Sequence, residues 1–388
     1  MLFDHFYLKS KLSAGLTGLY AHSVVKYVGT GLTDLFLPIF LFERLGGSVT
    51  NIILFYLAYA GLFFLFVSVG AMTMSKIGLK ISMILAVAFL GLYYFSFYVF
   101  QQKNEFALIV LSLVAITFFQ ILFWVSYHTD FAKFTDRSSR GRQLSVLSSA
   151  ISLTSFVIPA LSGFIIQKFG FDALFVIAIV LILTSAFPLF SLPDVREKFD
   201  YSYFQTFREF FRRKNRKMAL AYGSDGAQSI VGAVIWPIFI YQLMKGEYLA
   251  VGLISSVIVA MSIIFQLATG SFADKMDKRR LVKIGSVLYA MGWVGKAFIQ
   301  TGFQIFVVGA YHSFSSIMMR TPFDAMMYDK SADQGHQIDE YSVIREMAVN
   351  GGRVLMLLLL LVLFSFTSAS LGAAFLIAAA VSLLVNIL

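Results

Sequence analysis

Ionisable side chains stand inside two long apolar stretches of this sequence. His22, Lys26 and Asp34 fall within a stretch near the N-terminus, and Asp225 falls within another in the second half. A charge removed from water is unfavourable unless it faces a partner or a water-filled cavity. These four residues are therefore candidates for binding a charged solute or for carrying a proton.

Lys26 is the most deeply placed of them. It is the fourteenth of thirty residues in the stretch 13–42, so at least about 18 Å of helix would separate it from either end. Its side chain is too short to span that distance, and we expect it to face a partner or a cavity. His22 precedes it by one helical turn and shares its face. Asp34 lies two turns beyond, where a cavity position and simple wetting at the outer mouth are equal alternatives.

Further ionisable residues stand in apolar stretches of the second half: His312, Arg320, Asp324, Arg345, Glu346 and Arg353. Arg353 is about 16 Å deep along its helix, which favours a position facing a cavity. Arg320 and Asp324 are four residues apart, and Arg345 and Glu346 stand near one end. These four residues are typical of gate or interfacial salt bridges.

Lys296 differs from these residues because it is four residues from the end of its stretch and can reach outward to water. No two histidines have the spacing of a helical metal site, and the absence of cysteine excludes thiolate ligands and nucleophiles. No phosphate-binding loop, dinucleotide fingerprint or nucleophile triad occurs. The sequence predicts no metal, no cofactor and no enzymatic activity. The residues assigned to a substrate or proton cavity are His22, Lys26, Asp34, Asp225, His312 and Arg353.

Apolar helices must position these side chains. Of the 388 residues, 59% are hydrophobic and 13% are charged, and the mean hydropathy is +0.80; a soluble domain has about 25% charged residues. The stretches reach roughly the 20 residues of a membrane-spanning helix and are too long for membrane strands. We predict an all-α membrane protein with twelve spans: 13–42, 50–74, 79–100, 105–129, 143–167, 172–191, 218–243, 248–272, 281–300, 303–328, 342–365 and 368–388.

Basic residues concentrate in alternate loops. With the N-terminus inside, four of the 31 Lys and Arg residues fall in outside loops: Arg44, Lys103, Lys168 and Lys245. The inside segments contain 22 of them, and this excess of basic residues predicts cytoplasmic N- and C-termini. It also accounts for the net charge of +10 without a nucleic-acid partner. The N-terminus lacks the pattern of a removable signal peptide.

The longest polar stretch divides the spans into six and six. Within it, Phe204, Phe207 and Phe211 recur at spacings of three and four beside an Arg cluster. This pattern predicts an amphipathic helix over 203–216 along the cytoplasmic face, and a flexible linker is the alternative. The predicted units are an N-terminal six-helix bundle 1–191, a linker 192–217 and a C-terminal six-helix bundle 218–388.

The two halves repeat each other weakly, which indicates an internal duplication. The first two matches have a shift of 199 residues and the third a shift of 193. Three segments return in order: 38–42 as 237–241, 76–80 as 275–279, and 132–138 as 325–331. The shift of 199 also pairs Lys26 with Asp225.

The loop 270–279, GSFADKMDKR, resembles the G-x-x-x-D-R/K-x-G-R/K-R/K loop of the major facilitator superfamily of secondary transporters, with Asp277 in place of a glycine. The first-half copy is degraded, since Ala71 and Ser75 replace the first glycine and the acid. Residues 159–163 resemble the G-P-x-x-G-G segment seen in many antiporters. The arginine motif of the fourth span, common in drug–proton antiporters, is absent.

This resemblance implies twelve helices in two pseudo-symmetric six-helix bundles around a central cavity. It places the first and seventh spans opposite each other, so that Lys26 and Asp225 would face each other at similar depth. It also implies that the loop acid docks on a helix of the other half and closes a cytoplasmic gate. The predicted gate residues are Ser75, Lys76, Asp274, Lys275, Arg320, Asp324, Arg345 and Glu346.

The expected function is proton-coupled export of a small organic or amphiphilic solute by alternating access. Uptake by proton symport is an alternative, and a non-transporting membrane receptor or scaffold is a third reading. The expected partners are the solute, protons and the lipid bilayer. We expect a monomer in a prokaryotic inner membrane.

Overall fold

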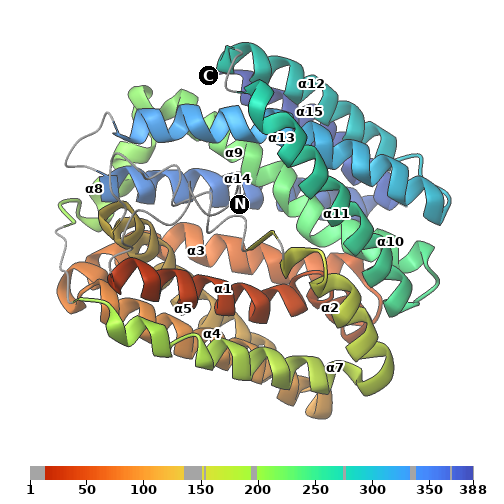
Figure 1. The fold of residues 1–388 in the computed structure, drawn as a ribbon, viewed down its shortest axis with the longest axis horizontal. Coiled ribbons are helices and arrows are strands. Elements are labelled where there is room, and N and C mark those ends of the chain that lie inside the picture. The colour runs from red at the N-terminus through yellow and green to blue at the C-terminus, as the bar shows by residue number, and fades with distance from the viewer. Residues whose placement is uncertain are drawn as a thin grey trace, which may run out of the picture.

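The computed structural model of the 388-residue chain describes residues 14–134, 151–152, 154–193, 199–273, 277–332, 338–367 and 369–387. All regular elements of these residues are helical (Figure 1). The first half contains α1 (Ala14–Asp34), α2 (Leu37–Arg44), α3 (Val49–Ile77), α4 (Leu79–Lys103), α5 (Phe106–Phe134), α7 (Ile158–Thr184) and η1 (Phe187–Ser191). The remainder contains α8 (Tyr203–Phe210), η2 (Arg213–Asn215), α9 (Arg216–Ile230), η3 (Val231–Ile235), α10 (Trp236–Leu243), α11 (Tyr248–Ala273), α12 (Lys278–Lys296), α13 (Gly302–Ala332), α14 (Ile338–Phe366), α15 (Leu371–Ser382) and η5 (Leu383–Ile387).

Eight helical segments of the described residues are long and apolar enough to cross a membrane. The predicted spans 281–300, 303–328 and 368–388 also form helices, although they are not among those eight segments. The helix α12 begins with three basic residues, and α15 has only 12 residues. Part of the predicted span 143–167 lies outside the described residues. The count of twelve spans therefore stays a prediction.

Each half contains a helix break at the proline of its repeated segment. In the first half α1 ends and α2 begins with Pro38 in its first turn. In the second half a π-helical turn, η3, separates α9 from α10, and Pro237 stands in the first turn of α10. Proline lacks a backbone N–H and clashes with the preceding turn, so a continuous helix is unfavourable at both positions.

A glycine produces the break between the predicted fifth and sixth spans. Gly170 has a φ of 78° inside α7, in the left-handed region that glycine adopts without steric cost. This residue falls in the gap between the predicted spans 143–167 and 172–191. The two parts of α7 are consequently two helical directions joined at Gly170.

The helices of each half pack chiefly on helices of the same half (Figure 1). The helices α1, α3, α4, α5 and α7 contact each other, and so do α9, α11, α12, α13, α14 and α15. The closest contacts between these groups are those of α3 with α14 and of α7 with α11, and α5 also contacts α14. The second pair is very close, because a Cβ added at Gly252 would lie 2.3 Å from the Pro159 carbonyl oxygen.

The segment between the halves forms a shorter helix than the predicted 203–216. Ser202 caps the N-terminus of α8 by accepting a hydrogen bond from the Gln205 amide. The Phe207 and Phe210 rings pack against Phe64 of α3, with ring centroids 5.8 and 5.7 Å away. Phe204, in contrast, is 82% exposed, so α8 presents one aromatic face to the helices and leaves another uncovered.

Candidate functional site

A cavity of about 260 Å³ lies where α1, α7, α10 and α11 meet. Both halves of the chain contribute to its wall, because α1 and α7 precede the linker and α10 and α11 follow it. Among the described lining residues Asp34 carries the only charge. The lining residues are Tyr27, Gly31, Asp34, Leu35, Ser155, Ile158, Pro159, Trp236, Ser255, Ile258 and Val259.

One face of α1 supplies the polar side of the cavity. Tyr27, Gly31 and Asp34 follow each other at spacings of four and three residues, so they share a helix face. The Tyr27 hydroxyl lies 2.8 Å from Ser155 Oγ, which joins α1 to the middle of the fifth predicted span. Asp34 remains exposed at the helix end. Asp34 thus lines the cavity and is also exposed at the helix end, so both sequence alternatives for it stay predictions.

Lys26 points away from this face and is not among the lining residues. Its ammonium nitrogen lies 4.5 Å from the centroid of the Phe123 ring and 5.6 Å from that of Trp124, both on α5. A cation over an aromatic face is stabilised by the ring quadrupole. The carboxylate of Asp34 interacts electrostatically with the Lys26 ammonium group.

His22 is fully buried beside Phe123 and also lies outside the cavity lining. Its Nδ1 atom is 2.8 Å from the Ser185 carbonyl oxygen. A carbonyl oxygen can only accept, so Nδ1 carries the hydrogen. The contact fixes α1 against the end of α7, and His22 holds two helices together in this structure. The predicted cavity role of His22 stays a prediction.

Asp225 pairs with Arg320 and not with Lys26, the residue that the repeat and the resemblance place opposite it. Arg320 Nη2 lies 2.7 Å from Asp225 Oδ1, and Gln228 Nε2 donates to the same oxygen at 2.8 Å. The Tyr289 hydroxyl donates to Gln228 Oε1 at 2.6 Å. These contacts join α9, α12 and α13 inside the second half. The repeat predicts equivalent positions for Lys26 and Asp225 but not the direction of their side chains.

The predicted Arg320–Asp324 contact is replaced by this Asp225–Arg320 pair. Asp324 is exposed, and it interacts electrostatically with Arg320 and Arg345. Arg345 lies 3.4 Å from Glu346, and its guanidinium stands 5.3 Å from the centroid of the Tyr222 ring. The predicted Arg345–Glu346 salt bridge is therefore present.

Arg353 lies at the contact between the halves. Its Nη1 donates to Asn350 Oδ1 at 3.1 Å, and its Nε is buried without a hydrogen-bond partner. Tyr59 of α3 interacts electrostatically with Arg353 and Glu346 of α14 and with Asp34. Arg353 is not among the residues that line the 260 Å³ cavity, so its predicted role there stays a prediction.

Lys296 is buried, which contradicts the expectation that it reaches outward. Its side chain is 4% exposed, and its ammonium nitrogen lies 4.3 Å from the ring centroids of both Trp236 and Trp293. Lys296 is the last residue of α12, and a helical side chain points back toward the N-terminus of its helix. The position of Lys296 near the helix end therefore directs the side chain inward.

His312 is buried beside these rings. Its ring centroid lies 4.3 Å from that of Tyr289 and 4.6 Å from that of Trp293. Its Nδ1 has no hydrogen-bond partner, and a Cβ added at Gly292 would lie 2.7 Å from that atom. His312 thus belongs to a compact aromatic cluster behind the cavity wall rather than to the wall itself.

The predicted gate loops are described in part. The Ser75 hydroxyl donates to the Met72 carbonyl of its own helix at 2.8 Å, and Lys76 stands in the last turn of α3. Asp274 and Lys275 lie outside the described residues. Asp277 caps α12, because its carboxylate accepts a hydrogen bond of 2.7 Å from the Arg279 amide.

A second, wider hollow of about 530 Å³ lies at the start of α12. It is lined by Asp277, Lys278, Arg279 and Met326. No residue of the predicted cavity or gate is among these four. We therefore place the candidate site at the 260 Å³ cavity.

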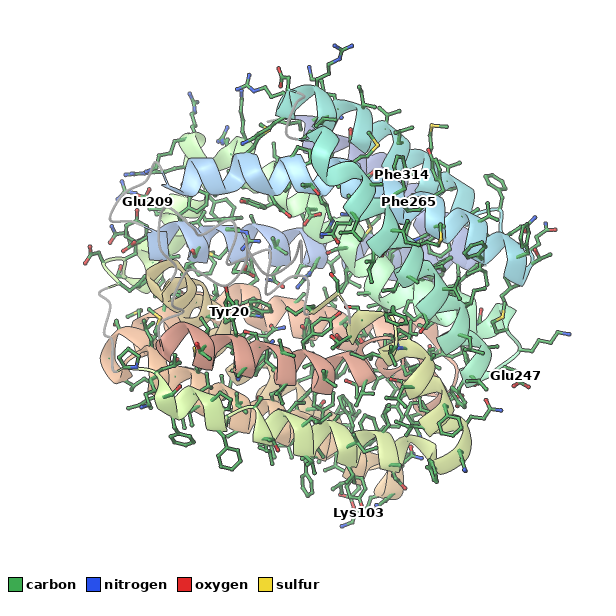
Figure 2. The ribbon with its side chains drawn as sticks, in the orientation of Figure 1. Tyr20, Lys103, Glu209, Glu247, Phe265 and Phe314 are labelled. Carbon is green, nitrogen blue, oxygen red and sulfur yellow. The ribbon has the colours of Figure 1, made fainter. Side chains whose placement is uncertain are left out.

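Sequence reasoning missed a polar contact where α2 meets α10 and α11. Glu43, at the end of α2, accepts hydrogen bonds from the hydroxyls of Tyr241 and Tyr248. Gln167 of α7 adds a hydrogen bond of 3.2 Å from the Leu249 amide. Glu247 lies at this edge of the molecule, far from Glu209 of α8 (Figure 2). These contacts join α2 and α7 of the first half to α10 and α11 of the second.

Comparisons with known proteins identify a family and two structures of similar fold. The family model of the Major Facilitator Superfamily matches residues 20–321. A crystal structure of the peptide transporter POT in complex with alafosfalin has a TM-score of 0.73 and 10% identity, covering 96% of this chain and 92% of that chain. The transporter FucP, crystallised in the outward conformation, has a TM-score of 0.65 and 14% identity, covering 96% and 97%. Comparison with curated protein sequences gives no match.

Proposed function

Since this chain belongs to the major facilitator superfamily and is a transporter rather than an enzyme, we propose that it carries a small cationic solute through the cavity at Asp34. The mechanism is alternating access, in which the two halves rock about the solute. The observation that carries the proposal is the position of Asp34 as the only charge among the described lining residues.

Aromatic and polar neighbours complete the proposed binding site. Trp236 and Tyr27 line the cavity beside Asp34, and aromatic faces stabilise ammonium groups within about 6 Å of the ring centroid. Ser155 and Ser255 offer hydrogen bonds. Lys26 is engaged with Phe123 and lies outside the lining, so it does not repel a cation there directly. An ammonium compound fits this chemistry better than a carboxylate does.

The volume supports a small solute. Sites for drug-sized ligands span roughly 300–1,000 Å³, and this cavity has about 260 Å³. We propose export in exchange for protons as the direction and energy source, because a positively charged solute and a proton can replace each other electrically. No nucleotide-binding motif in the sequence offers ATP as an alternative.

The proposal includes the architecture and location expected from the sequence. It assumes twelve spans in two six-helix bundles, 1–191 and 218–388, joined by the linker 192–217. It also assumes a monomer in a prokaryotic inner membrane with cytoplasmic termini. The concentration of basic residues in alternate loops supports this orientation.

A thermal-shift measurement with three compounds of similar shape tests the charge preference. Benzylammonium, benzyl alcohol and benzoate differ mainly in charge, so the purified protein should be stabilised by benzylammonium most strongly. Asp34→Asn should remove most of that stabilisation while the unliganded protein remains folded. Equal stabilisation by the three compounds would contradict the assignment of Asp34 as the residue that binds the cation. Stabilisation of Asp34→Asn by benzylammonium to the same extent as the wild type would contradict it as well.

A further inference from the structure

The ammonium group of Lys296 is a buried cation without a counter-ion in the described part of the chain. It lies between the Trp236 and Trp293 rings, 4.3 Å from each centroid. No described carboxylate is within ion-pair distance of it. The favourable interaction with two aromatic faces therefore offsets part of the free-energy cost of removing the ammonium group from water.

The elements around Lys296 contribute few ionisable groups. On its own helix the nearest is Tyr289, which donates to Gln228. The helix α13 contributes His312, and its Arg320 is held by Asp225. The described residues of α15, η3 and η5 contain no ionisable side chain, and in α10 only Tyr241 is ionisable, which bonds Glu43. The charge of Lys296 therefore depends mainly on the two indole rings and on His312.

Trp236 connects this cation to the proposed solute site. The same indole that holds the Lys296 ammonium also lines the cavity that contains Asp34. A cationic solute on the cavity side would place a second positive charge near one ring. Like charges repel strongly when water is excluded between them, so the solute and the charge on Lys296 oppose each other.

The backbone at Trp236 is suited to movement. The π-helical turn η3 ends at Ile235, and Pro237 follows Trp236 without an amide hydrogen. Single π-helical turns inside α-helices are frequent at functional sites. A shift of Trp236 would open a path between Lys296 and the cavity water.

We propose that Lys296 carries the proton that is exchanged for the solute, with Trp236 as the shared wall. This inference rests on the proposed cationic solute. When the solute binds, the Lys296 ammonium releases one proton to the cavity water and becomes a neutral amine. When the solute leaves, the amine takes a proton back. Each monovalent solute is exchanged for one proton, so the cycle moves no net charge.

Accumulation of radiolabelled tetraethylammonium in proteoliposomes tests this coupling. For one-to-one exchange, a gradient of one pH unit should give about a tenfold concentration ratio of the cation, and a membrane potential alone should give none. In Lys296→Met the proton site is lost. That variant should ignore the pH gradient and instead give about a tenfold ratio for a potential of about 59 mV.

Two further variants keep the test decisive if Lys296→Met folds poorly. Lys296→Arg retains a permanent charge and should lose the response to both gradients, whereas Trp236→Leu should weaken the pH response by removing the shared ring. Lys168→Met is the matched control, because Lys168 also stands over two aromatic rings but is exposed. It should behave as the wild type does.

The outcomes separate this inference from the proposed function. If the wild type neither binds nor moves the cation, the proposed function fails. If the wild type exchanges the cation for protons and Lys296→Met keeps the full pH response, the proposed function stands and the role of Lys296 is overturned. A purely structural Lys296 would change the amount of folded protein and leave the dependence on pH and potential as in the wild type.

Discussion

At the scale of residues, two charged pairs of the second half are neutralised within that half, whereas Asp34 of the first half faces the cavity. Asp225 accepts hydrogen bonds from Arg320 and Gln228, and Arg345 lies beside Glu346. A buried or half-buried charge left alone is destabilising, so each of these partners favours one arrangement of α9, α13 and α14. No cationic side chain is among the described lining residues beside Asp34, and its electrostatic neighbour Lys26 lies over the Phe123 ring.

The Asp225–Arg320 pair should show direct energetic coupling. Asp225→Asn and Arg320→Met each leave one group without its charged partner, so each should destabilise the protein. The double variant should be more stable than the sum of the single changes predicts, by about 0.5–3 kcal/mol. Thermal unfolding in detergent measures the difference.

The same cycle with Lys26→Met in place of Arg320→Met is the control. Lys26 contacts Phe123 and Trp124 and not Asp225, so the two changes should add within about 0.5 kcal/mol. Strong coupling of Lys26 to Asp225, with none between Arg320 and Asp225, would restore the pairing that the repeat suggests.

At the scale of elements, the contact between α7 and α11 depends on small residues. Gly163 lies against the Tyr248 carbonyl, and a Cβ there would be 2.4 Å from its oxygen. Gly252 faces the Pro159 carbonyl in the same way. The Ala160 amide donates to Ser256 Oγ at 3.0 Å across this contact. The absence of side chains lets the two backbones approach closely.

Gly252→Ala should separate these helices. The added methyl group would overlap the Pro159 oxygen, and overpacking of this kind costs about 1–3 kcal/mol. The midpoint of thermal unfolding should therefore fall. Gly61→Ala is the matched change, because nothing lies within 4 Å of a Cβ at Gly61 of α3, and alanine favours the helix by up to about 1 kcal/mol. Equal effects of the two changes would contradict the close contact.

The sequence predicts the helices and their breaks well because these depend on local chemistry. Apolar length predicts α3, α4 and α5, and Gly170 and Pro237 mark breaks by their backbone properties. The family resemblance is confirmed by the match over residues 20–321.

Side-chain directions were harder to predict, since they depend on the neighbours that tertiary packing supplies. The depth of Lys26 does not indicate Phe123 as its partner. Lys296 is four residues from the end of its predicted span, which suggests that its ammonium group reaches water, but two indole rings surround that group. Glu43 was missed because its partners Tyr241 and Tyr248 are about 200 residues away. Spacing along one chain carries no signal for such contacts.

At the scale of the whole molecule, the polar contacts around Glu43 hold the halves together at one end of the cavity. Glu43 belongs to the first half, and Tyr241 and Tyr248 belong to the second. Hydrogen bonds to an ionised group contribute roughly 1.5–3 kcal/mol, and about 1.4 kcal/mol changes the ratio of two conformers tenfold. In the proposed alternating-access cycle, these bonds would break each time the cavity opens at that end.

Glu43→Gln should therefore shift the population toward molecules open at the end formed by α2 and α10. The chain has no native cysteine, so Ser255→Cys provides a single reporter in the cavity wall. Its labelling by a membrane-impermeant maleimide should become several-fold faster with Glu43→Gln. Glu105→Gln, at an exposed turn, is the control. Labelling that is unchanged in Glu43→Gln would show that this contact does not close the cavity.

The central claim is that Asp34 binds a cationic solute which then crosses the membrane, and counterflow of tetraethylammonium tests it most directly. Proteoliposomes loaded with unlabelled tetraethylammonium and diluted into the labelled compound need no ion gradient, so the result does not depend on the coupling mechanism. We predict transient accumulation of label by the wild-type protein and none by Asp34→Asn. Wild-type vesicles that match protein-free vesicles, or Asp34→Asn vesicles that match the wild type, would contradict the account.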